Sequence, residues 1–248
     1  MAPMTLNGKT AVVTGAAGTM GLAAVRMFLE EGAKVALVDV DAMRLDGLAR
    51  FLRGPILAVP CDVSDAHAVR QALQQVEQTL GPVDILLNNA AIPSSDRAES
   101  TNDSEWRRVM ATNLDGAFML ARGVLPSMKR QGWGRIVNVS SLAAKTGGLA
   151  GGAAYAASKG GLASLTYALA RECASFGVTV NAIAPAYVKT AATAQLNESQ
   201  QRQILAQIPV GRFCEPEEFA HAVRFLCSPL SGFITGEIVD LNGGLVMD

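Results

Sequence analysis

The sequence is poor in cysteine and histidine and has no excess of charge of either sign. Its 248 residues include 4 cysteines and 2 histidines, and the formal net charge is −1. Without a CxxC pair or a block of basic residues, the chain indicates neither a metal site nor a surface for nucleic acid or anionic membrane. We therefore expect no metal and a small-molecule ligand. The thiols are expected to be reduced and mostly buried: Cys61, Cys173, Cys214 and Cys227.

Long hydrophobic runs are also missing. No apolar run approaches the ~20 residues that span a membrane, and the N-terminus MAPMTLNGKT lacks the charged region and apolar core of a secretion signal. We expect no membrane association and a cytoplasmic location. Hydrophobic residues nevertheless make up 50% of the chain, which is enough to bury a full core.

Short β-branched runs alternate with longer helical patterns along the whole chain. Strands that are apolar throughout, each separated from the next by a helix, predict a parallel sheet covered on both faces. No linker, charge run or repeat divides residues 1–248, so we interpret them as one doubly wound α/β domain of about seven strands. Strands are expected at 10–14, 34–39, 56–61, 83–88, 135–140, 178–183 and 237–241, and helices near 20–31, 42–52, 66–80, 103–130, 153–175 and 216–227, with Asp65, Asp103 and Glu215 as caps.

A glycine-rich turn follows the first expected strand. The segment TGAAGTMG (14–21) contains Gly15, Gly18 and Gly21 and opens a helix, with Thr19 and Met20 inside the turn. Glycines let a backbone approach a pyrophosphate closely, and the helix N-terminus offers unpaired N–H groups. The simpler interpretation is a turn that uses glycine for packing alone. The position between strand and helix favours dinucleotide binding.

An aspartate ends the second expected strand. In dinucleotide-binding sheets an acidic side chain at this distance from the glycine turn accepts hydrogen bonds from the adenosine ribose. Asp39 would then repel a 2′-phosphate, and neither Ala17 nor Gly18 supplies a basic residue in the turn. The sequence therefore predicts NAD as cofactor and disfavours NADP. A solvated cap residue is the alternative interpretation of Asp39.

Polar residues follow the next strands as well. Asp62 comes just after the third strand, and Asn88 and Asn89 lie at the end of the fourth. Helix caps would explain each one separately, but successive polar residues at the carboxyl ends of parallel strands predict a cleft for a dinucleotide. Ser140 and Ser141 end the fifth strand, where a hydroxyl can bind a substrate carbonyl.

The segment YAASK places a tyrosine and a lysine four residues apart in a helical pattern. This spacing puts Tyr155 and Lys159 on one helix face, where a positive charge favours the phenolate and moves the pKa of the tyrosine toward working pH. Such a tyrosine can give or take a proton. A surface lysine beside a half-buried tyrosine is the simpler interpretation of the pair alone.

Taken in order, these motifs resemble the classical short-chain dehydrogenase/reductase family, from about Lys9 to Gly244. The resemblance rests on TGAAGTMG, NNAA, Asn113, the serine pair followed by YAASK, and NAIAPAYVKT. It implies a Rossmann-type fold, a nicotinamide cofactor and a homotetramer assembled through helices. The long helices around Asn113 and Tyr155 have more apolar and small positions than one buried face needs, which agrees with such packing.

The resemblance also implies a role for each site residue. Tyr155 would be the general acid/base, Ser141 would polarise the substrate oxygen, and Asn113 would hold a water in a proton relay. Lys159 would lower the pKa of the tyrosine and bind the nicotinamide ribose. The implied catalytic set is Asn113, Ser141, Tyr155 and Lys159, and the cofactor-binding set is Gly15, Gly18, Thr19, Met20, Gly21, Asp39, Asp62, Val63, Asn89, Ala90, Tyr155, Lys159, Pro185, Val188 and Thr190.

The chain departs from the family pattern at several positions. Thr19 stands where the middle glycine is usual, Ala91 replaces the last glycine of its motif, and Ala186 replaces the glycine after Pro185. The loop from Ser141 to the catalytic tyrosine is about one residue longer than is common. These departures leave the geometry of the phosphate turn and the shape of the substrate pocket open. We expect the pocket to be built from the segments 92–100, 142–152 and 190–209.

We interpret the chain as an NAD-dependent oxidoreductase that interconverts a secondary alcohol and a ketone, with a small polyol or hydroxy acid as substrate. One alternative is an NADPH-using reductase of 3-oxoacyl thioesters on acyl carrier protein or coenzyme A. Such reductases commonly have a basic residue where this chain has Phe176, which speaks against a carrier protein. The other alternative is a non-catalytic dinucleotide sensor, which would not need all four catalytic residues.

Overall fold

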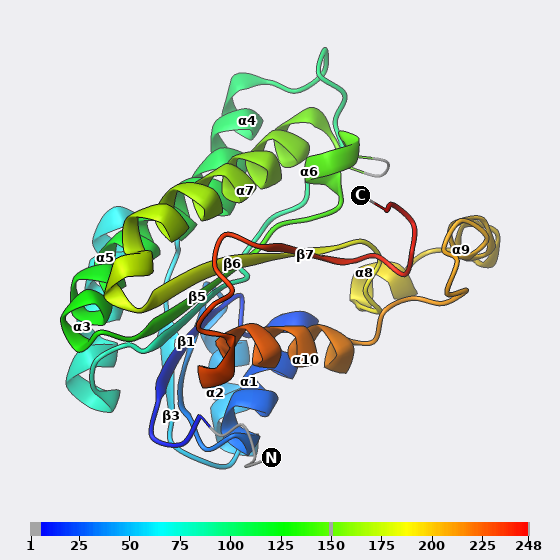
Figure 1. Ribbon diagram of the computed structural model, residues 1–248. Helices are drawn as coiled ribbons and strands as arrows, with labels where there is room; N and C mark the ends of the chain where they lie inside the picture. Colours follow the sequence, from blue (N-terminus) through cyan, green and yellow to red (C-terminus); the bar gives the residue numbers. More distant parts are fainter. Residues whose placement is uncertain (1–5, 149–150, 248) are drawn as a thin grey trace.

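Seven parallel strands form a single sheet in the order β3-β2-β1-β4-β5-β6-β7 (Figure 1). The computed structural model describes residues 6–148 and 151–247. The chain reverses its direction of travel across the sheet between β1 and β4, which is where doubly wound sheets bind their ligands. The strands are β1 (Thr10–Thr14), β2 (Lys34–Asp39), β3 (Ile56–Pro60), β4 (Ile85–Asn88), β5 (Gly134–Val139), β6 (Val178–Pro185) and β7 (Ile238–Leu241).

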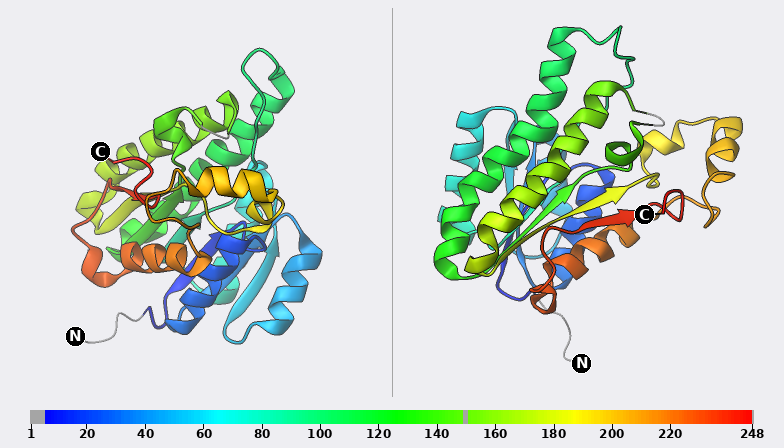
Figure 2. Two further views of the ribbon diagram at one scale, coloured as in Figure 1. Left: turned by 90° about the vertical axis from the view of Figure 1, so that its right-hand side faces the viewer. Right: turned by 45° about the horizontal axis from the view of Figure 1, so that its top comes forward.

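Helices cover both faces of this sheet (Figure 2). One core packs α3 (Ala66–Leu80), α5 (Gly116–Gln131) and α7 (Ala153–Cys173) on one face. The other core packs α1 (Thr19–Glu30), α2 (Ala42–Phe51) and α10 (Pro216–Cys227) on the opposite face. Every residue of β1, β4, β5 and β6 is buried, which explains why these strands are apolar without alternation.

The helix expected over 103–130 is interrupted. It consists of α4 (Asp103–Met110), a π-helical turn over Ala111–Asp115 and α5. The π turn buries Asn113 and directs it toward the loop after β4. Asn102, and not Asp103, caps α4 by accepting a hydrogen bond from the backbone of Glu105. The caps expected at Asp65 and Glu215 are present.

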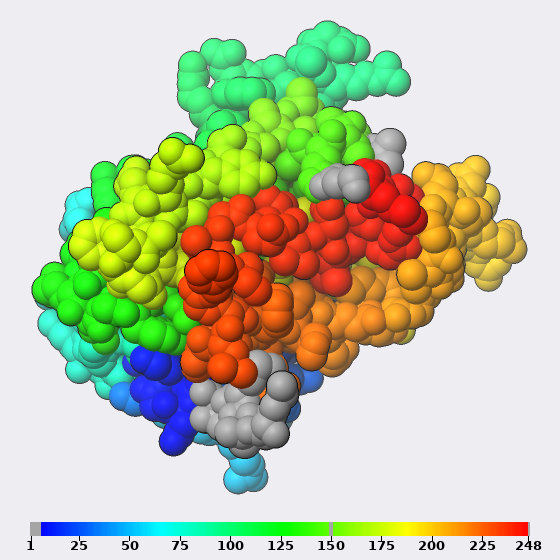
Figure 3. All heavy atoms as spheres, viewed as in Figure 1, coloured from blue at the N-terminus to red at the C-terminus, as the bar shows by residue number. Residues whose placement is uncertain are grey.

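Three short helices that the sequence pattern did not predict lie beyond the carboxyl edge of the sheet. They are α6 (Ala143–Thr146), α8 (Ala191–Ala194) and α9 (Glu198–Leu205). Figure 3 shows the segment with α8 and α9 projecting from the body of the molecule, coloured yellow to orange. In the described part of the chain, no helix has the length and hydropathy needed to cross a membrane.

Candidate active site

The predicted cofactor-binding residues come together at the carboxyl edge of the sheet. All of them except Asp62 and Val63 line one hollow of about 580 Å³. Asp62 and Val63 line an adjoining hollow, which shares Gly15, Asp39 and Ala90 with the first. The two hollows meet above β1 and β4, where the order of the strands reverses. Residues spread over most of the chain therefore form one continuous cleft of the kind that holds a dinucleotide.

The glycine turn is held by its neighbour strand. The Asn89 side chain donates to the carbonyl oxygens of Thr14 and Gly15, at 2.9 and 3.2 Å. Gly15 has a positive φ of 63°, and a Cβ at Gly21 would overlap the carbonyl oxygen of Gly15. Both positions therefore need glycine.

The first turn of α1 suits a phosphate group. Gly18 is the N-cap and supplies no side chain to cap the helix, and the first turn contains no acidic residue. The N–H groups at this end of α1 are thus available to an anion. Gly18 has an ordinary φ of −78°, so the shift of one glycine to this position and the presence of Thr19 are compatible with the turn.

Asp39 is already engaged within the protein. One carboxylate oxygen accepts the Ala17 N–H at 3.0 Å, and the other accepts the Asp41 N–H at 3.1 Å. The carboxylate therefore braces the glycine turn from the end of β2. Arg44, on the first turn of α2, lines the same hollow. Sequence reasoning looked for a basic residue only in the glycine turn and missed this arginine.

The adjoining hollow carries residues that the sequence did not single out. Arg108 and Thr112 line it from α4 and the π turn. Asp62 accepts from both the backbone and the hydroxyl of Ser64, at 2.9 and 2.7 Å, so its side chain shapes the loop after β3. The π turn cannot be inferred from a helical pattern, which is why Thr112 escaped notice.

The other end of the cleft is formed by the loop after β6. Pro185, Val188 and Thr190 all line the large hollow. Val188 is held by a parallel β-bridge to Cys214, and Thr190 begins α8 in a capping box with Thr193. These bonds fix the part of the cleft nearest to Tyr155.

Tyr155 and Ser141 lie together where the cleft meets a second, smaller pocket. Burial raises the pKa of Tyr155, and a hydrogen bond with the Ser141 side chain opposes that rise. The net shift in the pKa of Tyr155 is therefore upward in the protein without cofactor, and the lowering effect expected of Lys159 stays a prediction. The phenol is protonated at neutral pH.

Lys159 is buried, with 2% of its surface exposed. Its ammonium donates to the carbonyl oxygen of Val139 at 2.6 Å and lies 5.8 Å from the centre of the Tyr155 ring. Burial lowers the pKa of Lys159 to about 8. Lys159 thus lies beside the tyrosine, as the spacing predicted, but its direct bond is to the end of β5.

The side chains of Asn113 and Ser140 hydrogen-bond to backbone groups of the protein. The Asn113 amide accepts the Ile92 N–H at 2.8 Å and donates to the Ile92 carbonyl at 3.0 Å and to the Ser158 hydroxyl at 3.1 Å. Ser140 donates to the Lys159 carbonyl at 3.0 Å. Asn113 therefore positions the loop after β4 relative to α7. Of the two serines, Ser141 is the one beside Tyr155.

The second pocket has a volume of about 200 Å³ and more apolar than polar wall. Two of the segments expected to form a substrate pocket contribute to it, namely 92–100 and 142–152. Residues 149 and 150 of the second segment lie outside the described residues. The third segment, 190–209, does not line this pocket. Helix α9 of this segment projects outward (Figure 1), and Tyr187 lines the pocket instead.

Comparison with known proteins agrees with this geometry. The profile of the family described as Enoyl-(Acyl carrier protein) reductase matches residues 15–246. The 3-oxoacyl-[acyl-carrier-protein] reductase FabG of Vibrio cholerae is 39% identical over 98% of this chain and 100% of its own, and that of Escherichia coli is 36% identical with the same coverage. A Brucella melitensis structure titled short-chain dehydrogenase/reductase SDR: Glucose/ribitol dehydrogenase matches with a TM-score of 0.91, 34% identity and 98% coverage of both chains.

These relatives overturn the expectation that NAD is the cofactor and that NADP is disfavoured. Reductases of 3-oxoacyl thioesters are the NADPH-using alternative that the sequence left open, and they are the relatives found. One feature of the structure agrees with these relatives: Arg44 brings a positive charge to the hollow that Asp39 lines. The Asp39 carboxylate accepts one backbone N–H on each oxygen and keeps further lone pairs, so its hydrogen bonds alone do not select the cofactor.

The relatives also support a 3-oxoacyl thioester as substrate better than the polyol or hydroxy acid predicted from the sequence. The comparisons agree on the family and on the type of reaction, which do not depend on the choice between these substrates. The fold, the profile match and relatives above 30% identity along nearly the full length all agree. This chain belongs to the classical short-chain dehydrogenase/reductase family and is an oxidoreductase acting on CH–OH and keto groups.

Proposed function

We propose that this protein reduces the ketone of a 3-oxoacyl thioester to the alcohol, with NADPH as the reductant. The observation that carries the proposal is a mainly apolar pocket that opens onto the Ser141 and Tyr155 side chains and joins the dinucleotide cleft there. An acyl chain suits such a wall, while the two hydroxyls suit a ketone oxygen. The similarity to 3-oxoacyl reductases supports the same substrate class.

The residues present fit a phosphorylated dinucleotide. The N–H groups at the start of α1 would hold the pyrophosphate, and Arg44 would meet the 2′-phosphate. Val188 and Thr190 would hold the nicotinamide end. When bound, the cofactor supplies the hydride.

Tyr155 is the proton donor in this proposal. Its raised pKa keeps the phenol protonated through neutral pH, so it can donate a proton to the ketone oxygen as negative charge develops there. Ser141 hydrogen-bonds the same oxygen and orients it. Since the acid form is required, reduction should slow as the pH rises toward the raised pKa of the tyrosine, and oxidation of the alcohol should gain.

Lys159 and Asn113 support the proton donor. The Lys159 ammonium stabilises the phenolate left after donation and binds the ribose, from its place at the end of β5. Asn113 keeps the loop after β4 and α7 in register through Ile92 and Ser158. We assign Asn113 a positioning role.

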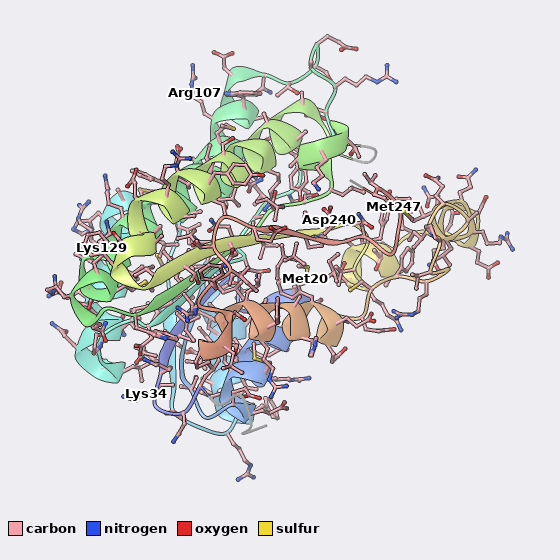
Figure 4. The ribbon with its side chains drawn as sticks, viewed as in Figure 1. Met20, Lys34, Arg107, Lys129, Asp240 and Met247 are labelled. Carbon is pink, nitrogen blue, oxygen red and sulfur yellow. The ribbon has the colours of Figure 1, made fainter. Side chains whose placement is uncertain are left out.

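The carrier of the acyl chain can be coenzyme A or acyl carrier protein. This chain has Phe176 where reductases acting on carrier proteins commonly have a basic residue. The Lys129 ammonium, however, lies 4.8 Å from the centre of the Phe176 ring. The position therefore retains a positive charge. Figure 4 shows Lys129 at the opposite end of the molecule from Met247 and the projecting helices α8 and α9.

A spectrophotometric assay tests the proposal. NADPH consumption should be fastest with acetoacetyl-CoA or a 3-oxoacyl carrier protein, compared with a panel of polyols and hydroxy acids oxidised in the reverse direction. Tyr155→Phe serves as the inactive control. Faster NADP-linked turnover of a polyol than of any thioester would overturn the proposal.

We also propose a homotetramer. Large apolar side chains are exposed on the outer faces of α4, α5 and α7, with Trp106 at 42%, Phe118 at 41% and Tyr167 at 54%. A second apolar area includes Leu230 and Phe233 near the edge strand β7. Two such areas on one chain fit an assembly with two kinds of twofold contact. Light scattering at micromolar concentration should give four times the mass of one chain, and a monomer would contradict it.

The cysteines support a reducing location, and we propose the cytoplasm. All four are free thiols, and three of them, Cys61, Cys173 and Cys227, are buried. Such thiols are typical of proteins that are not exposed to oxidising conditions.

A further inference from the structure

Ser94 lines the substrate pocket, and its hydroxyl has no partner among the residues that the structure describes. The residue is 7% exposed, and its Oγ is buried. Other hydroxyls in the same wall are paired, since Ser141 accepts the Ala143 N–H and Thr146 donates to the Leu142 carbonyl. A buried polar group without a partner costs about 1 to 3 kcal/mol, so its position beside a pocket suggests that a ligand supplies the missing bond.

The backbone around Ser94 is fixed from both sides. Its carbonyl oxygen accepts the Gly152 N–H at 2.6 Å, and Gly152 is the N-cap of α7, the helix that carries Tyr155. On the other side, the Asn113 amide pairs with both backbone groups of Ile92. A Cβ at Gly152 would overlap the carbonyl oxygen of Asp96. The Ser94 backbone is therefore held in place relative to the helix that carries the proton donor.

We propose that Ser94 is a specificity-determining residue that donates a hydrogen bond to the thioester carbonyl of the substrate. This inference rests on the proposed function. A 3-oxoacyl thioester has two carbonyl oxygens, separated by one methylene group. With the ketone oxygen on Tyr155 and Ser141, the thioester oxygen needs a second donor in the same pocket. A plain ketone would leave Ser94 unpaired, so the enzyme favours the thioester.

Paired variants on two substrates test the assignment. Ser94→Ala and the control Ser175→Ala, at an exposed serine in the turn after α7 and outside both the substrate pocket and the dinucleotide cleft, are assayed with acetoacetyl-CoA and with a simple ketone of similar length. For Ser94→Ala, kcat/KM on the thioester should fall about 5- to 10-fold, as expected for one neutral hydrogen bond, mainly through KM. Its kcat/KM on the ketone should not change. Ser175→Ala should match the wild type on both substrates.

Thermal unfolding separates recognition from folding. Ser94→Ala removes an unpaired hydroxyl, so its Tm should equal or exceed that of the wild type. Equal losses on thioester and ketone would indicate a structural role and overturn the assignment, as would no loss on either. A wild type that reduces the ketone but no thioester would overturn the proposed function together with this inference, whereas an active wild type with an unaffected Ser94→Ala variant would overturn the inference alone.

Discussion

The two ends of the cleft are built in different ways. At the cofactor end, polar groups are paired within the protein: Asn89 holds the glycine turn, and Asp39 braces it from the neighbouring strand. At the substrate end, three loops meet beyond the sheet, and Ser94 is left without a partner. The cofactor end is thus a fixed cradle made largely of backbone. The substrate end depends on side chains whose partner comes from outside.

Tyr155 belongs to both ends, and removing its hydroxyl should separate them most clearly. Tyr155→Phe removes the proton donor with little change in volume, so kcat should fall by at least roughly 10²-fold, as expected for general acid catalysis. NADPH binding, followed by the fluorescence of the bound cofactor, should persist. Retention of most of the turnover would show that another group donates the proton.

A single glycine substitution should disrupt the cofactor end, because the glycine turn depends on close contacts between backbone atoms. A Cβ at Gly21 meets the Gly15 carbonyl, whereas a Cβ at Gly18 would have 3.3 Å to the same oxygen. Gly21→Ala should therefore lower the free energy of unfolding by about 1 to 3 kcal/mol and weaken NADPH binding, measured by denaturation and calorimetry. Gly18→Ala is the matched control and should change both much less. Equal effects would argue against a steric requirement at Gly21.

Lys159 places a buried charge between the two ends of the cleft. Removing it should raise the free energy of unfolding and abolish activity. Its pKa is lowered to about 8, so burying the charge costs stability at every pH below about 8, and the cost fades as the pH rises to the value of the unfolded chain, about 10.4. Lys159→Met should then raise the free energy of unfolding by about 1 to 3 kcal/mol at neutral pH, and reduction should be lost. Denaturation from pH 7 to 10 should show the gain shrinking. A gain that is constant with pH would exclude this explanation.

Arg44 sharpens the comparison at the cofactor end, where it is the side chain proposed to recognise the 2′-phosphate. Arg44→Ala should raise the KM for NADPH about 3- to 10-fold, since an exposed charged hydrogen bond is worth little more. Arg50→Ala on the same helix is the control and should leave the KM unchanged. An unchanged KM in Arg44→Ala would remove this residue from the site.

The sheet and most helices could be predicted because their signals are local. The bounds of β1, β2, α3 and α10 agree with the sequence pattern, since apolar periodicity and caps such as Asp65 act within a few residues. The π turn over Ala111–Asp115 was missed because an extra residue in a helical turn leaves the pattern helical. The small helices α6, α8 and α9 have too few residues to show a period.

The same difference between local and long-range signals applies to the site. Sequence motifs named every residue of the glycine turn and the pair Tyr155 and Lys159, because strand ends in a parallel sheet must meet at one edge. The cofactor preference was wrong because it rested on Asp39 and the glycine turn alone, whereas the fold brings Arg44 of α2 to the same hollow. The net direction of the pKa shift of Tyr155 also depends on burial, which the spacing to Lys159 does not reveal.

By itself, therefore, the sequence determined the doubly wound sheet and predicted the place of its ligand cleft and the reacting side chains, since these predictions follow from periodicity and from glycine, hydroxyl and ammonium groups at set spacings. Tertiary structure decided which polar groups are already paired and which remain free. Asp39 is paired through the glycine turn, and Ser94 is unpaired between Ile92 and Gly152. Hydrogen-bond satisfaction and desolvation depend on neighbours far away in the chain, and no local pattern records them.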